Sequence, residues 1–341
     1  MGKYTVVLLG ALLLVPNVVD AEVCAASKNW GLYNGFASSH IDAPRAWSLE
    51  QGSKSVVVAI VDTGIDPDHK DIRPNLWHDP KSKTTYGWDF VSDGPNPEDN
   101  HGHGTHIAGI IGAVYNATVG VSGVARKVSI MSVKYYSSDN KGYVNLENAI
   151  KAIHYAVEHG AKIINYSGGG PISSEEEYLA IKEAEDKGVL FVAAAGNDRH
   201  SLDLIGNNYY PASYKTSNVV SVASMDINGE IVPSSNWGPK SVDVAAPGEN
   251  IYSTLPGDKY GYMTGTSQAT AFVTGVAALL LSRCAGLKPS DARSIIMDSS
   301  VKTNSLKKRV ASGRLNAFEA IKELDRRKAR YPKLCEVQSG G

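Results

Sequence analysis

The sequence predicts an α/β fold in a single domain, with a doubly wound and mostly parallel sheet flanked by helices. Short apolar runs rich in Val and Ile alternate along the chain with segments of helical periodicity. The runs lack the polar alternation of half-exposed strands, which indicates that helices cover the sheet on both faces. In such sheets the functional residues gather at the carboxyl ends of the strands.

The predicted strands are short, and each ends close to a Gly, Asp, Asn or Ser that favours a turn. They span residues 56–61, 128–133, 162–166, 189–195 and 219–223. Segment 77–100 is rich in Pro, Gly, Asp and Asn, and we expect it to form a long surface loop.

Two segments between the strands have the clearest helical pattern. In 146–159, Ala149 and Ile153 lie among apolar residues that share one helical face. Segment 175–187 is followed by Gly188, a residue type that commonly ends helices. Both are predicted to cover the sheet.

The composition is that of an ordinary globular protein. A chain of 341 residues with 43% hydrophobic and 20% charged residues can bury the core of a large domain. Lys and Arg total 34 against 35 Asp and Glu, and the formal net charge is −1. This balance provides no positive field for a phosphate backbone, so no nucleic acid partner is expected.

The N-terminal residues have the pattern of a secretory signal. Lys3 is followed by an apolar stretch, 6–15, and then by Ala21 at a small-residue cleavage position. The stretch is shorter than the roughly 20 residues of a membrane-spanning helix. We expect a secreted or extracytoplasmic product with no membrane association after signal removal. The expected division is a signal peptide at 1–21, a short leader at 22–29, a globular domain at 30–328 and a C-terminal tail at 329–341.

The three cysteines, Cys24, Cys284 and Cys335, allow at most one intramolecular disulfide. A bond between Cys24 and Cys335 would join the two ends of the chain, but the sequence leaves the pairing open.

Ser267 is a candidate nucleophile. It lies between small residues just before the apolar run 271–281, which predicts a buried helix. There its hydroxyl can project into a cleft while the unpaired N–H groups of the helix face developing negative charge. A hydroxyl is a weak nucleophile, so the site also needs a base, a group that orients the base and an oxyanion donor.

Asp62 is the candidate orienting group, because it ends the predicted strand 56–61 and can accept a hydrogen bond from a histidine ring. A plain turn residue is the structural alternative. Asp62-Thr63-Gly64 also matches the loop of aspartic proteases, which need a second such loop. The chain has no second Asp-Thr-Gly or Asp-Ser-Gly.

Three histidines, His101, His103 and His106, are candidates for the base. Their H-x-H-x-x-H spacing also resembles zinc hydrolase clusters, although those usually carry Asp at the position of Thr105. A zinc site would leave Ser267 without a role.

Asn197 follows the predicted strand 189–195, and its side-chain amide could donate to an oxyanion opposite the N–H of Ser267. Turn residues of this type are also common after strands.

The order Asp62, His103, Ser267 is that of subtilisin and differs from the orders in chymotrypsin and α/β hydrolases. Four motifs, which carry Asp62, His103, Asn197 and Ser267 in turn, resemble those of the subtilisin-like serine proteases, or subtilases, and the resemblance runs over about residues 30–324. They are Val61-Asp62-Thr63-Gly64-Ile65-Asp66, His103-Gly104-Thr105-His106-Ile107-Ala108-Gly109, Ala194-Ala195-Gly196-Asn197 and Gly265-Thr266-Ser267-Gln268-Ala269-Thr270. This resemblance selects His103 as the base and leaves His106 as a structural residue.

The resemblance implies a monomeric serine endopeptidase whose catalytic domain, 30–328, cleaves proteins or peptides bound in extended conformation. It also implies a substrate-binding set, in which glycines leave room for a large apolar or aromatic P1 side chain. One wall is Ser167, Gly168, Gly169 and Gly170, the opposite extended segment is Asn140, Lys141 and Gly142, and Tyr209 lines the far side. The alternative is a folded but catalytically silent module that binds extended peptides in the same groove.

The resemblance further implies a structural Ca²⁺ site, since hard cations bind oxygen ligands drawn from a carboxylate, an amide and backbone carbonyls. Its ligands would be Asp71, Asn116 and the carbonyls of Val114, Val119 and Val121. The loop residues Asp89, Asp93 and Asp99 could hold a second ion, but we expect them to be solvated.

Overall fold

The computed structural model describes residues 28–35, 38–82, 84–115 and 121–336. The predicted signal peptide, most of the predicted leader and Cys24 lie outside these ranges.

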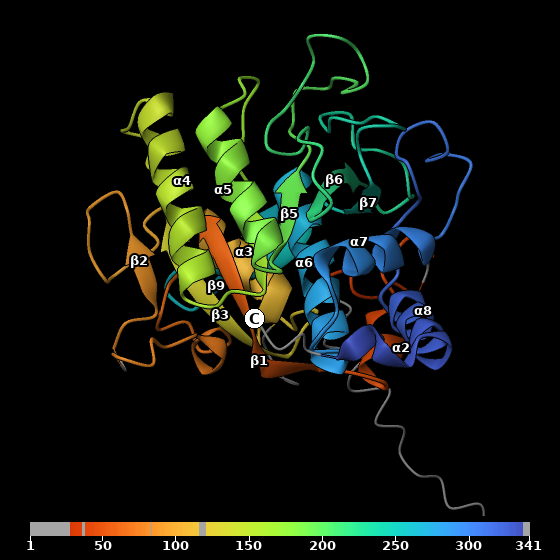
Figure 1. The fold of residues 1–341 in the computed structure, drawn as a ribbon, viewed down its shortest axis with the longest axis horizontal. Coiled ribbons are helices and arrows are strands. Elements are labelled where there is room, and N and C mark those ends of the chain that lie inside the picture. Colours follow the sequence, from red (N-terminus) through yellow and green to blue (C-terminus); the bar gives the residue numbers. More distant parts are fainter. Residues whose placement is uncertain (1–27, 36–37, 83, 116–120, 337–341) are drawn as a thin grey trace, which may run out of the picture.

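The described part contains a seven-stranded parallel sheet in the order β2-β3-β1-β4-β5-β6-β7 (Figure 1). This confirms the predicted α/β fold. The strands are β1 (Gly52–Asp62), β2 (Gly87–Asp89), β3 (Lys127–Lys134), β4 (Ile163–Tyr166), β5 (Leu190–Ala194), β6 (Val219–Met225) and β7 (Val244–Pro247). Segment 77–100 is therefore not all loop, because it contains β2, which pairs with β3.

Helices cover both faces of the sheet. The side chains of β1 alternate between two apolar cores, with Val58 and Ile60 in one and Ala59 and Val61 in the other. On the first face lie α3 (His103–Gly112) and α6 (Thr266–Arg283); on the second, α4 (Gly142–Glu158) and α5 (Glu175–Asp186) lie side by side (Figure 1). The two-sided burial explains why the strand sequences are apolar throughout.

Helix α6 is buried on all sides over most of its length, residues 266–281. Small residues permit this close packing: a Cβ at Gly275 would lie 2.5 Å from the Val124 side chain. The helix therefore fixes Ser267, its second residue, within the core.

The remaining elements lie around this framework. They are the antiparallel hairpin β8 (Ile251–Leu255) and β9 (Lys259–Met263), the helices α2 (Ala43–Trp47), α7 (Pro289–Asp298) and α8 (Ala317–Arg330), and the 3₁₀ turns η1 (Arg73–Asn75) and η2 (Pro332–Cys335). Cys284, just after α6, forms a disulfide with Cys335 in η2. The first part of the predicted tail is thus tied to the domain. Within the described residues, no helix has both the length and the apolar character needed to cross a bilayer.

Candidate active site

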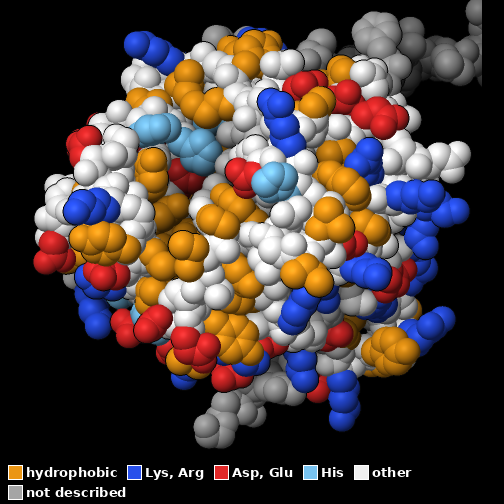
Figure 2. Space-filling model, turned by 90° about the horizontal axis from the view of Figure 1, so that it is seen from above, with side chains coloured by type: hydrophobic (Ala, Val, Ile, Leu, Met, Phe, Trp, Pro, Cys, Tyr) orange, Lys and Arg blue, Asp and Glu red, His pale blue; other side chains and the backbone are white. Residues whose placement is uncertain are grey.

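The carboxyl ends of the central strands bring the predicted site residues to one edge of the sheet. Asp62 ends β1, between β3 and β4, and Ser167 and Asn197 follow β4 and β5. The backbone N–H of Tyr135, just after β3, donates to the carbonyl of Asp62 at 3.0 Å. Seen from above, the molecule exposes histidine side chains beside a band of hydrophobic ones (Figure 2).

Asp62 and His103 are directly hydrogen bonded. His103 Nδ1 lies 2.7 Å from Asp62 Oδ1, and the backbone N–H of Thr63 donates to the same oxygen at 2.8 Å. The carboxylate is buried, with Asp62 only 3% exposed. Gly104 permits this approach of α3 to β1, because a Cβ there would lie 2.0 Å from the carbonyl oxygen of Gly64.

The charge of Asp62 decides the protonation of His103. Burial of the imidazole opposes its protonation, but the Asp62 carboxylate and its hydrogen bond outweigh this, and Asp99 adds to them. The pKa of His103 is therefore raised above its usual value. An imidazolium at this position is stabilised, as a general base requires once it has accepted a proton.

Ser267 is buried, and its Oγ donates to the carbonyl of Ser167 at 3.1 Å. Within the described residues this is the hydrogen bond that the hydroxyl forms, and none joins it to His103. The hydroxyl expected to pass its proton to His103 therefore points to Ser167 in this arrangement. Proton transfer to the imidazole requires the hydroxyl to turn away from Ser167, in line with the loose contacts of many substrate-free sites.

Asn197 is held next to the start of α6. Its Oδ1 accepts hydrogen bonds from the backbone N–H and the hydroxyl of Thr266, at 3.0 and 3.3 Å. Asn197 is an exposed residue, and anchoring its amide oxygen in this way leaves Nδ2 to donate elsewhere. Through Thr266, the side chain of Asn197 and the backbone N–H of Ser267 come to the same end of the helix.

The other two histidines do not join His103 in a metal site. His106 is fully buried, with Nε2 at 3.0 Å from the carbonyl of Ile251, and burial lowers its pKa to about 4. The exposed ring of His101 has its centroid 6.3 Å from that of His103. In the part of the chain that the structure describes, no group of three or more His, Cys, Asp or Glu could hold a metal ion. The zinc alternative thus has no support in the geometry.

Asp99 is a site residue that the sequence reasoning missed. It was expected to be solvated, but it is buried, and its Oδ1 accepts from the Thr63 hydroxyl and the backbone N–H of His101 and Gly102. Its Oδ2 accepts from the N–H and hydroxyl of Thr105. Asp99 therefore positions the start of α3 and with it His103. The signal available was its place just before a helix.

Asp89 also departs from the expected solvation. It is buried, and its carboxylate accepts from the backbone N–H of Val91 and the hydroxyl of Ser92. These contacts stabilise the turn after β2.

The glycines after β4 provide less free space than expected. A Cβ at Gly168 would lie 1.9 Å from the Tyr135 hydroxyl, and one at Gly169 would lie 2.6 Å from the Tyr209 ring. Only Gly170 faces open space. Two of the three glycines thus make room for tyrosines of this chain.

The segment opposite is not fully extended. Lys141 has extended backbone angles and is the N-cap of α4, whereas Gly142 is already the first helical residue. Asn140 lies in the turn before it. The prediction of an extended segment fails at its end because α4 begins four residues before the expected position 146.

Part of the predicted calcium ligand set can be placed. Asp71 is buried, its Oδ2 accepts from the Tyr260 hydroxyl at 2.6 Å, and its carbonyl accepts from Val114 N at 2.8 Å. Val121 is also buried, while Asn116 and Val119 lie outside the described residues. A buried carboxylate that accepts from the neutral Tyr260 hydroxyl fits an oxygen-binding cation, but among the described residues it does not belong to a group of three or more His, Cys, Asp or Glu that could hold a metal ion.

Comparison with known proteins gives one consistent family. The subtilase family model matches residues 53–318. Thermitase from Thermoactinomyces vulgaris is 40% identical over 288 residues, which is 84% of this chain and 95% of that protein. The major intracellular serine protease of Bacillus subtilis is 37% identical over 277 residues, 80% of this chain and 81% of that protein. Among solved structures, a protease of Pseudoalteromonas arctica superposes with a TM-score of 0.75 at 28% identity, covering 87% of this chain and 97% of that one.

Proposed function

The chain belongs to the subtilase family of serine endopeptidases, and from this premise we propose that Asp62, His103 and Ser267 form its catalytic triad, with Asn197 in the oxyanion hole. The observation that carries the proposal is the 2.7 Å hydrogen bond between Asp62 and His103 at the edge of the sheet where α6 presents Ser267.

In the proposed reaction His103 accepts the proton of the Ser267 hydroxyl as that oxygen attacks the peptide carbonyl. Asp62 stabilises the imidazolium so formed. The Nδ2 of Asn197 and the backbone N–H of Ser267 donate to the oxyanion. His103 then returns the proton to the leaving amine, and water, activated in the same way, releases the acyl group from Ser267.

The substrate is proposed to bind in extended conformation along Ser167–Gly170, as an added strand. The ring of Tyr209 lies against Gly169 and also against Gly196, where a Cβ would meet it at 2.7 Å. It forms an aromatic wall beside the catalytic edge, which favours a broad apolar or aromatic P1 preference.

We also propose that the protein is secreted, because residues 1–21 have the signal-peptide pattern. It is further proposed to act as a monomer with a catalytic domain at 30–328. A structural Ca²⁺ ion would be held by Asp71, the carbonyls of Val114 and Val121, and the undescribed Asn116 and Val119. Calcium should then raise the melting temperature of the inactive Ser267→Ala protein, and Asp71→Asn should abolish that rise. An equal rise in both proteins would contradict the site.

The test of catalysis is a fluorophosphonate label with casein hydrolysis. The purified protein should be labelled at Ser267, and Ser267→Ala should lose both labelling and hydrolysis. A parent that binds peptides without being labelled would instead support the silent binding module. Sequencing the N-terminus of the same secreted product would fix the processing site.

A further inference from the structure

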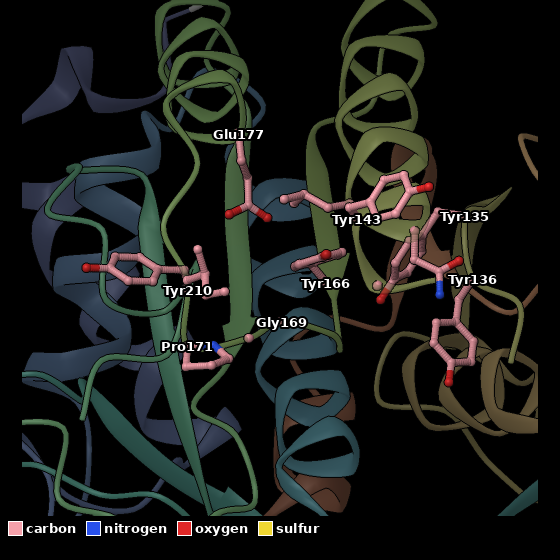
Figure 3. Close-up of a pocket in the computed structure, with 13 residues that line it drawn as sticks. Tyr135, Tyr136, Tyr143, Tyr166, Gly169, Pro171, Glu177 and Tyr210 are labelled. Atoms are coloured by element: carbon pink, nitrogen blue, oxygen red, sulfur yellow. The ribbon is translucent and has the colours of Figure 1, made fainter. Parts of the chain in front are cut away.

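A cavity of about 500 Å³ lies beside the proposed substrate-binding segment and is lined by aromatic rings. Tyrosines border it at the end of β3, in α4, in β4 and in the loop before Pro211, where the ring of Tyr210 itself points away from the other rings (Figure 3). They are Tyr135, Tyr136, Tyr143, Tyr166 and Tyr210. Gly169 and Gly170 form another part of the wall, so the cavity is continuous with the segment that begins at Ser167.

One carboxyl group projects into this apolar cavity. Glu177, in the first turn of α5, is only 2% exposed, and its carboxyl points toward the space between the tyrosines (Figure 3). None of the ion pairs formed by the described residues includes it. Burial raises its pKa to about 7.

The carboxyl is not needed to cap its own helix. Ser174 and Glu177 have the spacing of a capping box, in which the glutamate side chain would accept from the Ser174 N–H. That N–H donates instead to the Tyr214 oxygen at 2.9 Å, and the Tyr214 hydroxyl donates to the Ser174 carbonyl at 2.8 Å. Tyr214 thus replaces the side chain of Glu177 in the cap and leaves it facing the cavity.

A long basic side chain is the ligand that complements such a site. Its methylene stem would pack on the rings, and its cation would pair with the carboxylate and with the tyrosine faces. An acidic side chain would meet like charge, and a purely apolar one would bury the carboxyl without a partner.

We propose that this cavity is a specificity subsite that binds a lysine or arginine side chain of the substrate and pairs it with Glu177. The assignment rests on the proposed function, which places an extended substrate along Ser167–Gly170. At about 3.3 Å per residue, Gly170 is roughly 10 Å along the strand from Ser167, which contacts Ser267. The basic residue therefore lies a few positions from the bond that is cleaved.

The test is a set of fluorogenic peptides in which each position near a fixed cleavage site carries Lys, Arg, Leu or Glu in turn. At one position the parent should cleave the Lys and Arg peptides at least tenfold faster than the Leu peptide, in kcat/KM, and the Glu peptide slowest. Glu177→Gln should reduce the Lys-to-Leu ratio to near unity. Glu175→Gln, which removes an exposed glutamate from the same helical turn, should leave the ratio unchanged.

Fluorophosphonate labelling of each variant separates the possible failures. Labelled parent protein with no basic preference at any position would overturn the subsite alone, as would a labelled Glu177→Gln protein that retains the preference. A folded parent that is neither labelled nor able to cleave any peptide would overturn the proposed function and the subsite together.

Discussion

Replacement of Asp62 by Asn tests the proposed triad most directly, because the structure determines how the amide would sit. Both the Thr63 N–H and His103 Nδ1 approach the same oxygen, Oδ1. An amide nitrogen there would face two donors, so the asparagine oxygen should occupy that place. The substitution would then keep both hydrogen bonds and the tautomer of His103, and would remove only the negative charge.

The size of the effect follows from that charge. Two unit charges roughly 4 Å apart at an effective dielectric constant of 20 attract by about 4 kcal/mol. Loss of this attraction from the imidazolium corresponds to about a 10³-fold fall in kcat/KM. In the variant, the effect of burial on the imidazole would be largely unopposed. The pKa of His103, which is raised in the parent, should therefore fall below about 6.5.

The assay is peptide hydrolysis between pH 5 and pH 9. Because the base acts when neutral, activity should rise with pH, with a midpoint above about 6.5 in the parent and below it in Asp62→Asn. Asp68→Asn removes an exposed carboxylate nearby and should leave both rate and midpoint near those of the parent. A loss of less than tenfold in Asp62→Asn, or a midpoint that does not fall, would refute the proposed role of the charge.

Three further predictions concern the oxyanion donor, a buried histidine and the disulfide. Asn197→Ala should lower kcat by about 10² to 10³ with little change in KM, measured on the same peptides, and an unchanged kcat would remove Asn197 from the mechanism. His106 is buried in its neutral form, with its pKa lowered to about 4, so the unfolded chain binds a proton first as the pH falls. In the Ser267→Ala background, the free energy of unfolding should therefore decrease by about 2 kcal/mol between pH 7 and pH 5. Urea unfolding should show this loss and its absence in His106→Gln; equal pH slopes would contradict it. Removing the Cys284–Cys335 bond, which closes a separation of 51 residues, should lower the unfolding free energy by about 2–4 kcal/mol, and an unchanged urea midpoint in the double Ser variant would count against a stabilising role.

The central strands were predictable because their sequences carry the signal themselves. Residues 128–133 and 219–223 are Val-rich runs buried on both faces, and β3 and β6 extend them by only one or two residues at an end. The hairpin β8–β9 has no such signal. The strand Lys259–Met263 is mostly half-exposed and depends on its pairing with β8.

The residues of the candidate site also differ in whether the local sequence indicates their role. Asp62 and Asn197 could be identified because each lies at or just beyond the carboxyl end of a buried strand. The role of Asp99 consists of hydrogen bonds to residues up to 36 positions away, which no local pattern records. The actual fit of Gly168 and Gly169 was also hidden, since it depends on which tyrosines lie opposite them in space.

The position of Tyr209 has a consequence for engineering. Its ring touches Gly169 in the proposed substrate-binding segment and Gly196, the residue before Asn197, beside the proposed oxyanion hole. A smaller or larger side chain at this position would shift both loops at once. In the proposed mechanism, selectivity and turnover are thus mechanically linked here, and attempts to retune one through Tyr209 should alter the other unless a compensating change restores the packing at Gly196.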